Sequence, residues 1–170
     1  LHAGPSITPA LVYPLDQADG NGTNSVSFDV LVVATQTDAD STTESVTAPI
    51  TIVVEDTTPL LVDDMGSITE TQSSSGNLLT NDSPYEEPYT LTQITVNSTD
   101  YAVSAGAPAI VALVEGTLTV SVDGIWSFSA NRNVDNSGGD YDIVFSYTAE
   151  DADGDTSTAN VTLSIVDGEA

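Results

Sequence analysis

The sequence predicts an all-β protein made of β-sandwich domains in tandem, and three observations lead to that prediction. Apolar and polar residues alternate in many short runs, such as 143–147 and 159–165, as in strands that bury one face. Thr, Ser and Val are abundant, helix formers are scarce, and no long run has a helical period. One acidic hairpin pattern occurs twice, which indicates that a whole domain repeats.

The internal repeat relates two stretches that surround acidic turns. Asp38-Ala39-Asp40 matches Asp151-Ala152-Asp153 at an offset of 113 residues (151 − 38). Eight alternating positions agree in phase at that offset. Phe28, Val30, Val32, Ala34, Val46, Ala48, Ile50 and Ile52 correspond to Tyr141, Ile143, Phe145, Tyr147, Ala159, Val161, Leu163 and Ile165. A period near one hundred residues is typical of repeated domains rather than of solenoid units.

Residues 1–58 are expected to form only the C-terminal part of a sandwich. Residues 9–15 suit a short strand, a polar loop follows at 16–24, and two strands are predicted at about 25–35 and 45–55. Three strands cannot close a sandwich, and so small a sheet is marginally stable alone. The first domain is therefore predicted to be partial.

Residues 59–170 are expected to form a complete sandwich. The junction before it is Glu55-Asp56-Thr57-Thr58-Pro59, in which the proline favours an extended backbone. Asp123-Gly124 between two alternating runs predicts a hairpin turn. About seven or eight strands are predicted, near 60–62 (continuing along an edge at 68–71), 76–79, 91–96, 101–103, 118–122, 126–128, 143–147 and 159–166. Trp126 and Phe128 are predicted to fill the core. This strand spacing is typical of an immunoglobulin-type sandwich.

The charge of the chain excludes several classes of function. Its formal net charge is −25 at pH 7, with 26 Asp plus Glu against one basic side chain, Arg132. Binding along a nucleic-acid backbone needs Lys and Arg, and an anionic membrane surface repels such a chain. No apolar run is long enough to span a bilayer, no signal peptide is recognised, and the chain looks like a piece of something longer. The absence of cysteine excludes disulfide and thiolate chemistry.

The second domain carries an ordered set of motifs. These are Asp63-Asp64, Gly76-Asn77-Leu78-Leu79-Thr80-Asn81-Asp82, Asp123-Gly124-Ile125-Trp126-Ser127-Phe128, the stretch from Phe145 to Asp155, and the closing run from Val161 to Asp167. The set resembles the cadherin-like or immunoglobulin-like tandem repeats of giant bacterial RTX adhesins, including VCBS repeats. It covers about 56–170, with a partial second copy at about 25–56.

The resemblance implies a string of sandwich domains on a bacterial cell surface, exported by type I secretion and engaged in adhesion and biofilm formation. It also implies calcium at the junctions between domains. The partners implied are neighbouring repeats of the same long chain and a host or surface ligand bound through other domains. Nucleic acid and membrane insertion are not expected.

The resemblance also allows the acidic residues to be placed. Glu150, Asp151, Asp153 and Asp155 crowd into six residues at the last hairpin loop, where like charges repel unless a cation lies among them. In an immunoglobulin-like sandwich this loop lies at the same end as the N-terminus of the domain. The predicted metal ligands are therefore Glu55, Asp56, Asp63, Asp64, Asp82, Asp151, Asp153 and Asp155.

Calcium is the metal that this donor set favours. Calcium binds about six to eight oxygen ligands in flexible geometry, whereas magnesium demands a stricter octahedron. Zinc and redox metals are disfavoured with one His and no Cys. The loop lacks the EF-hand pattern, because Gly154 is fourth and Thr162 twelfth when counted from Asp151. The alternative is that these acids only solvate the surface.

The sequence favours a non-enzymatic, calcium-stabilised spacer of an adhesin over two alternatives. One is a ligand-binding region for a glycan or peptide, for which Tyr85, Tyr89 and Tyr101 are the aromatic candidates. An enzyme is least favoured, because only His2 could serve a Ser/His/Asp or Cys/His arrangement. For the half-domain three explanations stay open: a domain inserted within the sandwich, truncation or proteolysis, and completion by another chain.

Overall fold

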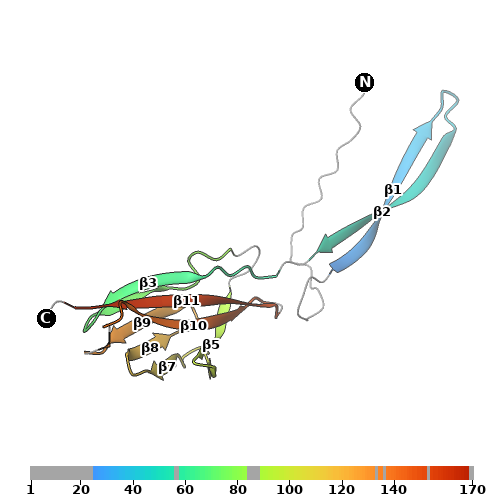
Figure 1. The fold of residues 1–170 in the computed structure, drawn as a ribbon. Helices are drawn as coiled ribbons and strands as arrows, with labels where there is room; N and C mark the ends of the chain where they lie inside the picture. The colour runs from blue at the N-terminus through green and yellow to red at the C-terminus, as the bar shows by residue number, and fades with distance from the viewer. Residues whose placement is uncertain are drawn as a thin grey trace. The chain divides into compact units, whose positions relative to one another are not determined.

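The computed structural model describes residues 25–55, 58–83, 89–132, 134–135, 137–152 and 154–168. The chain divides into two compact units, and of the described residues 25–55 belong to the first and 58–168 to the second. All regular elements among the described residues are β-strands (Figure 1). The prediction of an all-β protein is confirmed.

The described part of the first unit is a long hairpin. Strands β1 (Ser25–Thr37) and β2 (Thr43–Glu55) pair antiparallel from Ser25↔Glu55 to Thr37↔Thr43. Backbone hydrogen bonds from Asp38 N to Thr42 O, at 2.8 Å, and from Ser41 N to Asp38 O, at 2.9 Å, close the turn. Both strands extend further toward this turn than predicted, because hydroxyl pairs such as Thr37–Thr43 continue the ladder across polar residues.

The second unit is a sandwich of two sheets (Figure 1). Its described residues form nine strands: β3 (Asp64–Thr69), β4 (Ser73–Asn77), β5 (Thr90–Val96), β6 (Thr99–Ala102), β7 (Ala109–Ala112), β8 (Gly116–Val120), β9 (Ile125–Ala130), β10 (Tyr141–Glu150) and β11 (Thr156–Val166). One sheet has the order β3-β11-β10-β5-β6 and the other β4-β9-β8-β7. All neighbours are antiparallel except β3, which runs parallel to β11.

The core lies between the facing sides of these two sheets. The alternation in β10 and β11 places Phe145, Tyr147, Val161 and Leu163 at 0–2% exposure. Phe128 on β9 is buried opposite them, as predicted. Trp126, which was also predicted to fill the core, is only partly buried and packs against it. The indole lies instead over Gly76, where an added Cβ would be 2.9 Å from the Trp126 Nε1 atom.

Two local predictions are wrong for a common reason. Residues 60–62 form no strand: only Leu60 makes an isolated bridge, to Ser83, and the strand begins at Asp64. The strand predicted near 76–79 lies instead at Ser73–Asn77, a polar segment that lacks an apolar alternation. Polar side chains and backbone groups, rather than apolar periodicity, decide the course of both edge segments.

Candidate metal centre

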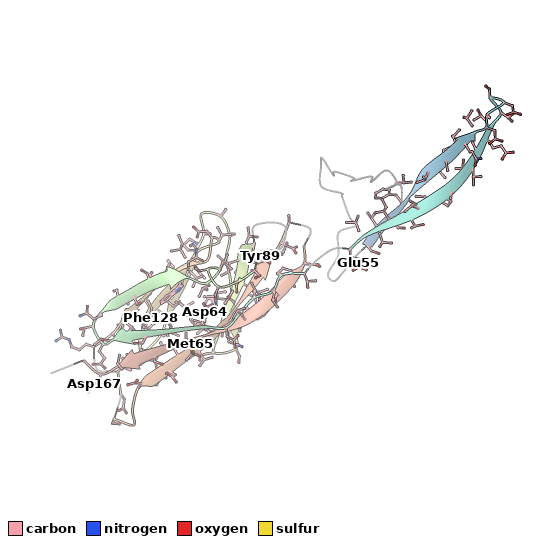
Figure 2. The ribbon with its side chains drawn as sticks, turned by 90° about the horizontal axis from the view of Figure 1, so that it is seen from above. Glu55, Asp64, Met65, Tyr89, Phe128 and Asp167 are labelled. Atoms are coloured by element: carbon pink, nitrogen blue, oxygen red, sulfur yellow. The ribbon has the colours of Figure 1, made fainter. Side chains whose placement is uncertain are left out.

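The first acidic group of the sandwich lies where the chain enters β3. We call Asp63, Asp64 and Asp82, with Asn81 and Tyr147, the entry cluster (Asp64 is labelled in Figure 2). Parallel pairing sets Asp64 beside Val161 of β11. Asp63 Oδ1 accepts hydrogen bonds from the backbone N of Asn160, at 2.8 Å, and from its Nδ2, at 3.3 Å. These bonds tie the start of β3 to the middle of β11.

Asp82 is the most deeply buried carboxylate of the entry cluster. It is 8% exposed, and its Oδ1 accepts a hydrogen bond from Val62 N at 2.7 Å. Its Oδ2 accepts one from the hydroxyl of Tyr147 at 3.0 Å. That hydroxyl also lies 3.3 Å from the carbonyl oxygens of Val62 and Leu78, but its single proton favours the charged acceptor. Burial raises the pKa of Asp82, and the two donors oppose the rise.

Asp64 is the least well compensated member of the entry cluster. Its Oδ2 is buried and has no hydrogen-bond partner among the described residues. With its amide nitrogen turned toward Asp64, Asn81 donates to Oδ1 at 3.2 Å. Burial raises the pKa of Asp64 to about 6, with further contributions from the charges of Asp82 and Asp63, while the Tyr147 hydroxyl and the Asn81 amide oppose the rise.

Tyr147 is the group around which the entry cluster is arranged. Its side chain is fully buried, so only the hydroxyl meets polar groups. Burial, followed by the charges of Asp64 and Asp82, raises the pKa of Tyr147 above its usual range. The phenol therefore stays protonated and serves as a donor. The alternation predicted only that Tyr147 is buried. Its hydroxyl is the signal that could have pointed to a polar partner inside the core, because a buried tyrosine hydroxyl usually has a hydrogen-bond partner.

The second acidic group lies in the β10–β11 loop. Asp151 Oδ1 accepts a hydrogen bond from Asp155 N at 2.8 Å, and Asp151 N donates to Asp155 O at 3.0 Å. Gly154 adopts a φ of +101°, which favours glycine at this point of the turn. Asp155 is fully buried and Asp151 half-buried. The loop thus draws two carboxyl groups out of full solvent contact.

The structure separates the predicted ligands along β11. Asp64 is level with Val161, six residues beyond Asp155 (161 − 155), which corresponds to about 20 Å of extended strand. Among the described residues, no three His, Asp or Glu side chains form a group that could hold one ion. Glu55 ends β2 in the first unit (Figure 2), and Asp56 and Asp153 lie outside the described residues. The assignment of Glu55, Asp56 and Asp153 as metal ligands stays a prediction.

The aromatic candidates for ligand binding have roles within the fold. The Tyr89 hydroxyl donates to the carbonyl oxygen of Ser83 (Tyr89 is labelled in Figure 2). Tyr101 packs against the hydrophobic core from β6. Tyr85 lies outside the described residues. Glycan or peptide binding also stays a prediction.

The two-sheet topology defines the second unit as an immunoglobulin-like sandwich. Residues 56–164 match the family model described as bacterial Ig domain. The chain belongs to the bacterial Ig domain family. Comparison with curated proteins gave no match. No helix in the described part of the chain is long and apolar enough to cross a membrane.

Several solved structures resemble the chain at low identity. The extracellular domain of protocadherin GammaB4 is 15% identical and aligns over 85% of this chain and 22% of that one, with a TM-score of 0.43. Extracellular cadherin domains 1–5 of protocadherin Gamma B2 are 14% identical and align over 85% of this chain and 26% of that one, with a TM-score of 0.38. The 2,6-sialyltransferase of Photobacterium sp. JT-ISH-224 is 15% identical and aligns over 62% of this chain and 18% of that one, with a TM-score of 0.36. The chain thus spans about a quarter or less of the length of these proteins.

Proposed function

We propose that this chain is a non-enzymatic, calcium-stabilised spacer of a bacterial cell-surface adhesin. Membership of the bacterial Ig domain family supports a binding or structural module rather than an enzyme. Export by type I secretion and a role in biofilm formation belong to the same proposal and rest on the resemblance to adhesin repeats. The second unit is the spacer domain, and calcium is its stabilising ligand.

The observation that carries the calcium proposal is the composition of the entry cluster. Asp64 Oδ2 is buried without a hydrogen-bond partner among the described residues, and the charges of Asp82 and Asp63 act on the same carboxylate. The whole chain has a single Lys or Arg side chain to neutralise 26 acids. A buried carboxylate that keeps its charge needs a counter-charge, and a cation from solution would provide it.

The donors of the entry cluster fit calcium. All of them are oxygens: the carboxylates of Asp63, Asp64 and Asp82, the side-chain oxygen of Asn81 in its other amide orientation, and nearby backbone carbonyls such as that of Val62. Calcium accepts this mixture with variable geometry. Asp151 and Asp155 form a second oxygen-rich position, to which the sequence prediction adds Asp153, Asp56 and Glu55.

The mechanical role follows from what the entry cluster holds. Asp82 binds Val62 N, and Asp63 binds Asn160, so the segment that leads into β3 is fastened to the sandwich through carboxylates. Repulsion among these carboxylates works against that attachment. Calcium would remove the repulsion and stiffen the entry of the chain into the second unit.

Thermal unfolding with calcium and with excess chelator tests the proposal. At a free calcium concentration about 100 times Kd, linkage stabilises the second unit by about 2.7 kcal/mol, which raises Tm by roughly 10 °C for a domain of about 110 residues. Asp64→Asn should remove most of the shift, whereas Asp140→Asn, at an exposed position before β10, should leave it intact. An equal shift with magnesium, or none with calcium, would contradict the proposal.

A further inference from the structure

The β1–β2 hairpin presents apolar side chains to solvent on a face that alternation marks for burial. None of the described residues of the first unit is buried. On the alternating face, Phe28 and Val30 are each 39% exposed, Ile50 53% and Val46 70%. No other described strand pairs with either edge of this two-stranded sheet. Such a surface is unusual on an isolated element and indicates a missing cover.

The β10–β11 hairpin of the same chain matches this element in structure as well as in sequence. At the offset of 113 residues, the pairs Phe28↔Ile52 and Val32↔Ala48 correspond to Tyr141↔Ile165 and Phe145↔Val161. The last pairs, Thr37↔Thr43 and Glu150↔Thr156, correspond as well. The two hairpins therefore share one register throughout.

The turns of the two hairpins also match. Asp38 N donates to Thr42 O at 2.8 Å, and Asp151 N donates to Asp155 O at 3.0 Å, which is the same bond at the same offset. The outward positions agree too, because Leu31 is 68% exposed and its counterpart Val144 is 56% exposed. Outward exposure is thus a property of both hairpins. At the inward positions Tyr141 is 39% exposed, as is its counterpart Phe28, but the counterparts of exposed Val30, Val46 and Ile50 are buried in the second hairpin.

The second unit shows what covers such a hairpin. β10 pairs antiparallel with β5, β11 pairs parallel with β3, and the β4-β9-β8-β7 sheet faces the inward side chains. The residues of β10 that pair with β5 correspond, at the offset of 113, to residues 32–37 of β1. The residues of β11 that pair with β3 correspond to residues 48–53 of β2. Pro49 stands where Thr162 stands and has no N–H, so pairing on β2 is expected over 50–53.

The sequence match continues upstream of the hairpin. At the same offset, Val12-Tyr13-Pro14-Leu15 corresponds to Ile125-Trp126-Ser127-Phe128, with large apolar residues in the same places. The chain therefore carries the sequence of a repeat from about residue 12 onward. The parts of the repeat equivalent to residues 64–124 would precede it in the same polypeptide.

We propose that the β1–β2 hairpin is the docking surface for the earlier strands of its own Ig-like repeat. Those strands would add one neighbour antiparallel to β1 over 32–37, one parallel to β2 over 50–53, and an apolar sheet over Phe28, Val30, Val46 and Ile50. The occupant is thus the remainder of a bacterial Ig domain, in cis. The proposal is independent of calcium binding.

A chimera that restores the cover tests this proposal. A copy of residues 58–124 is fused directly before Val12 of the chain, which keeps the repeat continuous because residue 124 corresponds to residue 11. Hydrogen exchange of the β1 and β2 amides should slow markedly, and a second cooperative unfolding transition should appear. Val32→Asp, on the inward face, should abolish both effects, whereas Leu31→Asp, on the outward face, should leave them intact.

A reciprocal chimera guards against a packing mismatch in the first. Residues 141–166 are replaced by residues 28–53, with Ala34→Tyr to restore the hydroxyl that binds Asp82. This hairpin should support cooperative unfolding of the second unit, again sensitive to Val32→Asp and not to Leu31→Asp. Failure of both chimeras to unfold cooperatively overturns the proposal. A dimer of the unmodified chain that Val32→Asp dissociates also overturns it, because the face would then belong to a second copy.

Discussion

The two hairpins of this chain, β1–β2 and β10–β11, have the same register and the same backbone bond across the turn, yet opposite environments. The inward residues Phe145 and Leu163 are 2% and 1% exposed, whereas Ile50, the counterpart of Leu163, is 53% exposed. Pairing and turn geometry are therefore local properties of the repeated sequence. Burial is not local, since it requires the β5 and β3 neighbours and the second sheet.

The acidic turns extend the comparison to function. Asp38 and Asp40 repeat Asp151 and Asp153, but Thr42 stands where the buried Asp155 stands, and Ala34 where Tyr147 stands. The first hairpin thus lacks both the buried loop carboxylate and the phenol of the entry cluster. The proposed calcium site is therefore assigned to the second repeat.

Truncation of one inward residue in each hairpin should give the largest contrast. Leu163→Ala creates a cavity in the core and should lower the free energy of unfolding by about 2–5 kcal/mol. Ile50→Ala, at the corresponding exposed position, should change the stability of the second unit by less than about 0.5 kcal/mol. Chemical denaturation followed by Trp126 fluorescence measures both. Equal losses would show that the first hairpin shares the core of the second unit.

Removal of the phenolic hydroxyl should have the next largest effect. Tyr147→Phe leaves Asp82 Oδ2 buried without its donor, which should cost about 1.5–3 kcal/mol because the bond involves a charged acceptor. Tyr141→Phe, at 39% exposure on the same strand, is the matched control and should have little effect. Urea unfolding at neutral pH, in chelator, checks the pair. Equal urea midpoints for Tyr147→Phe and Tyr141→Phe would show that the Tyr147 hydroxyl contributes no stability through the entry cluster.

The pH dependence of stability should be weaker but distinctive. The folded-state pKa of Asp64, about 6, exceeds its ordinary value of 3.8, so the native state binds more protons than the unfolded state between those values. In chelator, this contribution to the free energy of unfolding should therefore fall as pH rises from about 4 to about 7. The raised pKa of Asp82 acts in the same direction.

A substitution and the addition of calcium isolate the contribution of Asp64 to the pH dependence of stability. Asp64→Asn should flatten the fall, and saturating calcium should cancel it, because the ion favours the charged carboxylate. Denaturant titrations at several pH values, with and without calcium, supply the measurement. An unchanged slope in Asp64→Asn would assign the pH dependence to other groups.

The smallest expected contrast lies in the two turns. Asp151→Ala removes the acceptor for Asp155 N and should cost about 0.5–1.5 kcal/mol in chelator. Asp38→Ala removes a side chain that accepts from exposed Gln36 and should leave the second unit unaffected. Thermal unfolding of both variants in chelator is sufficient. A loss in Asp38→Ala as large as that in Asp151→Ala would contradict the assignment of stability to the second turn alone.

Much of the fold could be predicted from sequence because the signals are short-range. Alternation placed β10 and β11 and their buried faces, and Asp123-Gly124 placed a hairpin in which Gly124 takes a φ of +77°. The internal offset related the two hairpins before any pairing was known. The strand predicted near 76–79 lies at Ser73–Asn77, and its start was missed because an edge strand of Ser and Gly has no apolar alternation.

The candidate site, like the fold, was predicted from sequence only in part. The crowding of acids at 150–155 is visible in the sequence, and the resemblance to adhesin repeats added Asp63, Asp64 and Asp82 at the same end of the domain. The tertiary structure alone decided that Asp82 meets Tyr147, 65 residues away, and that Asp64 is level with Val161. The apolar period and the charges can be read from the sequence. Burial and the desolvation of a carboxylate arise only when distant strands pack around it.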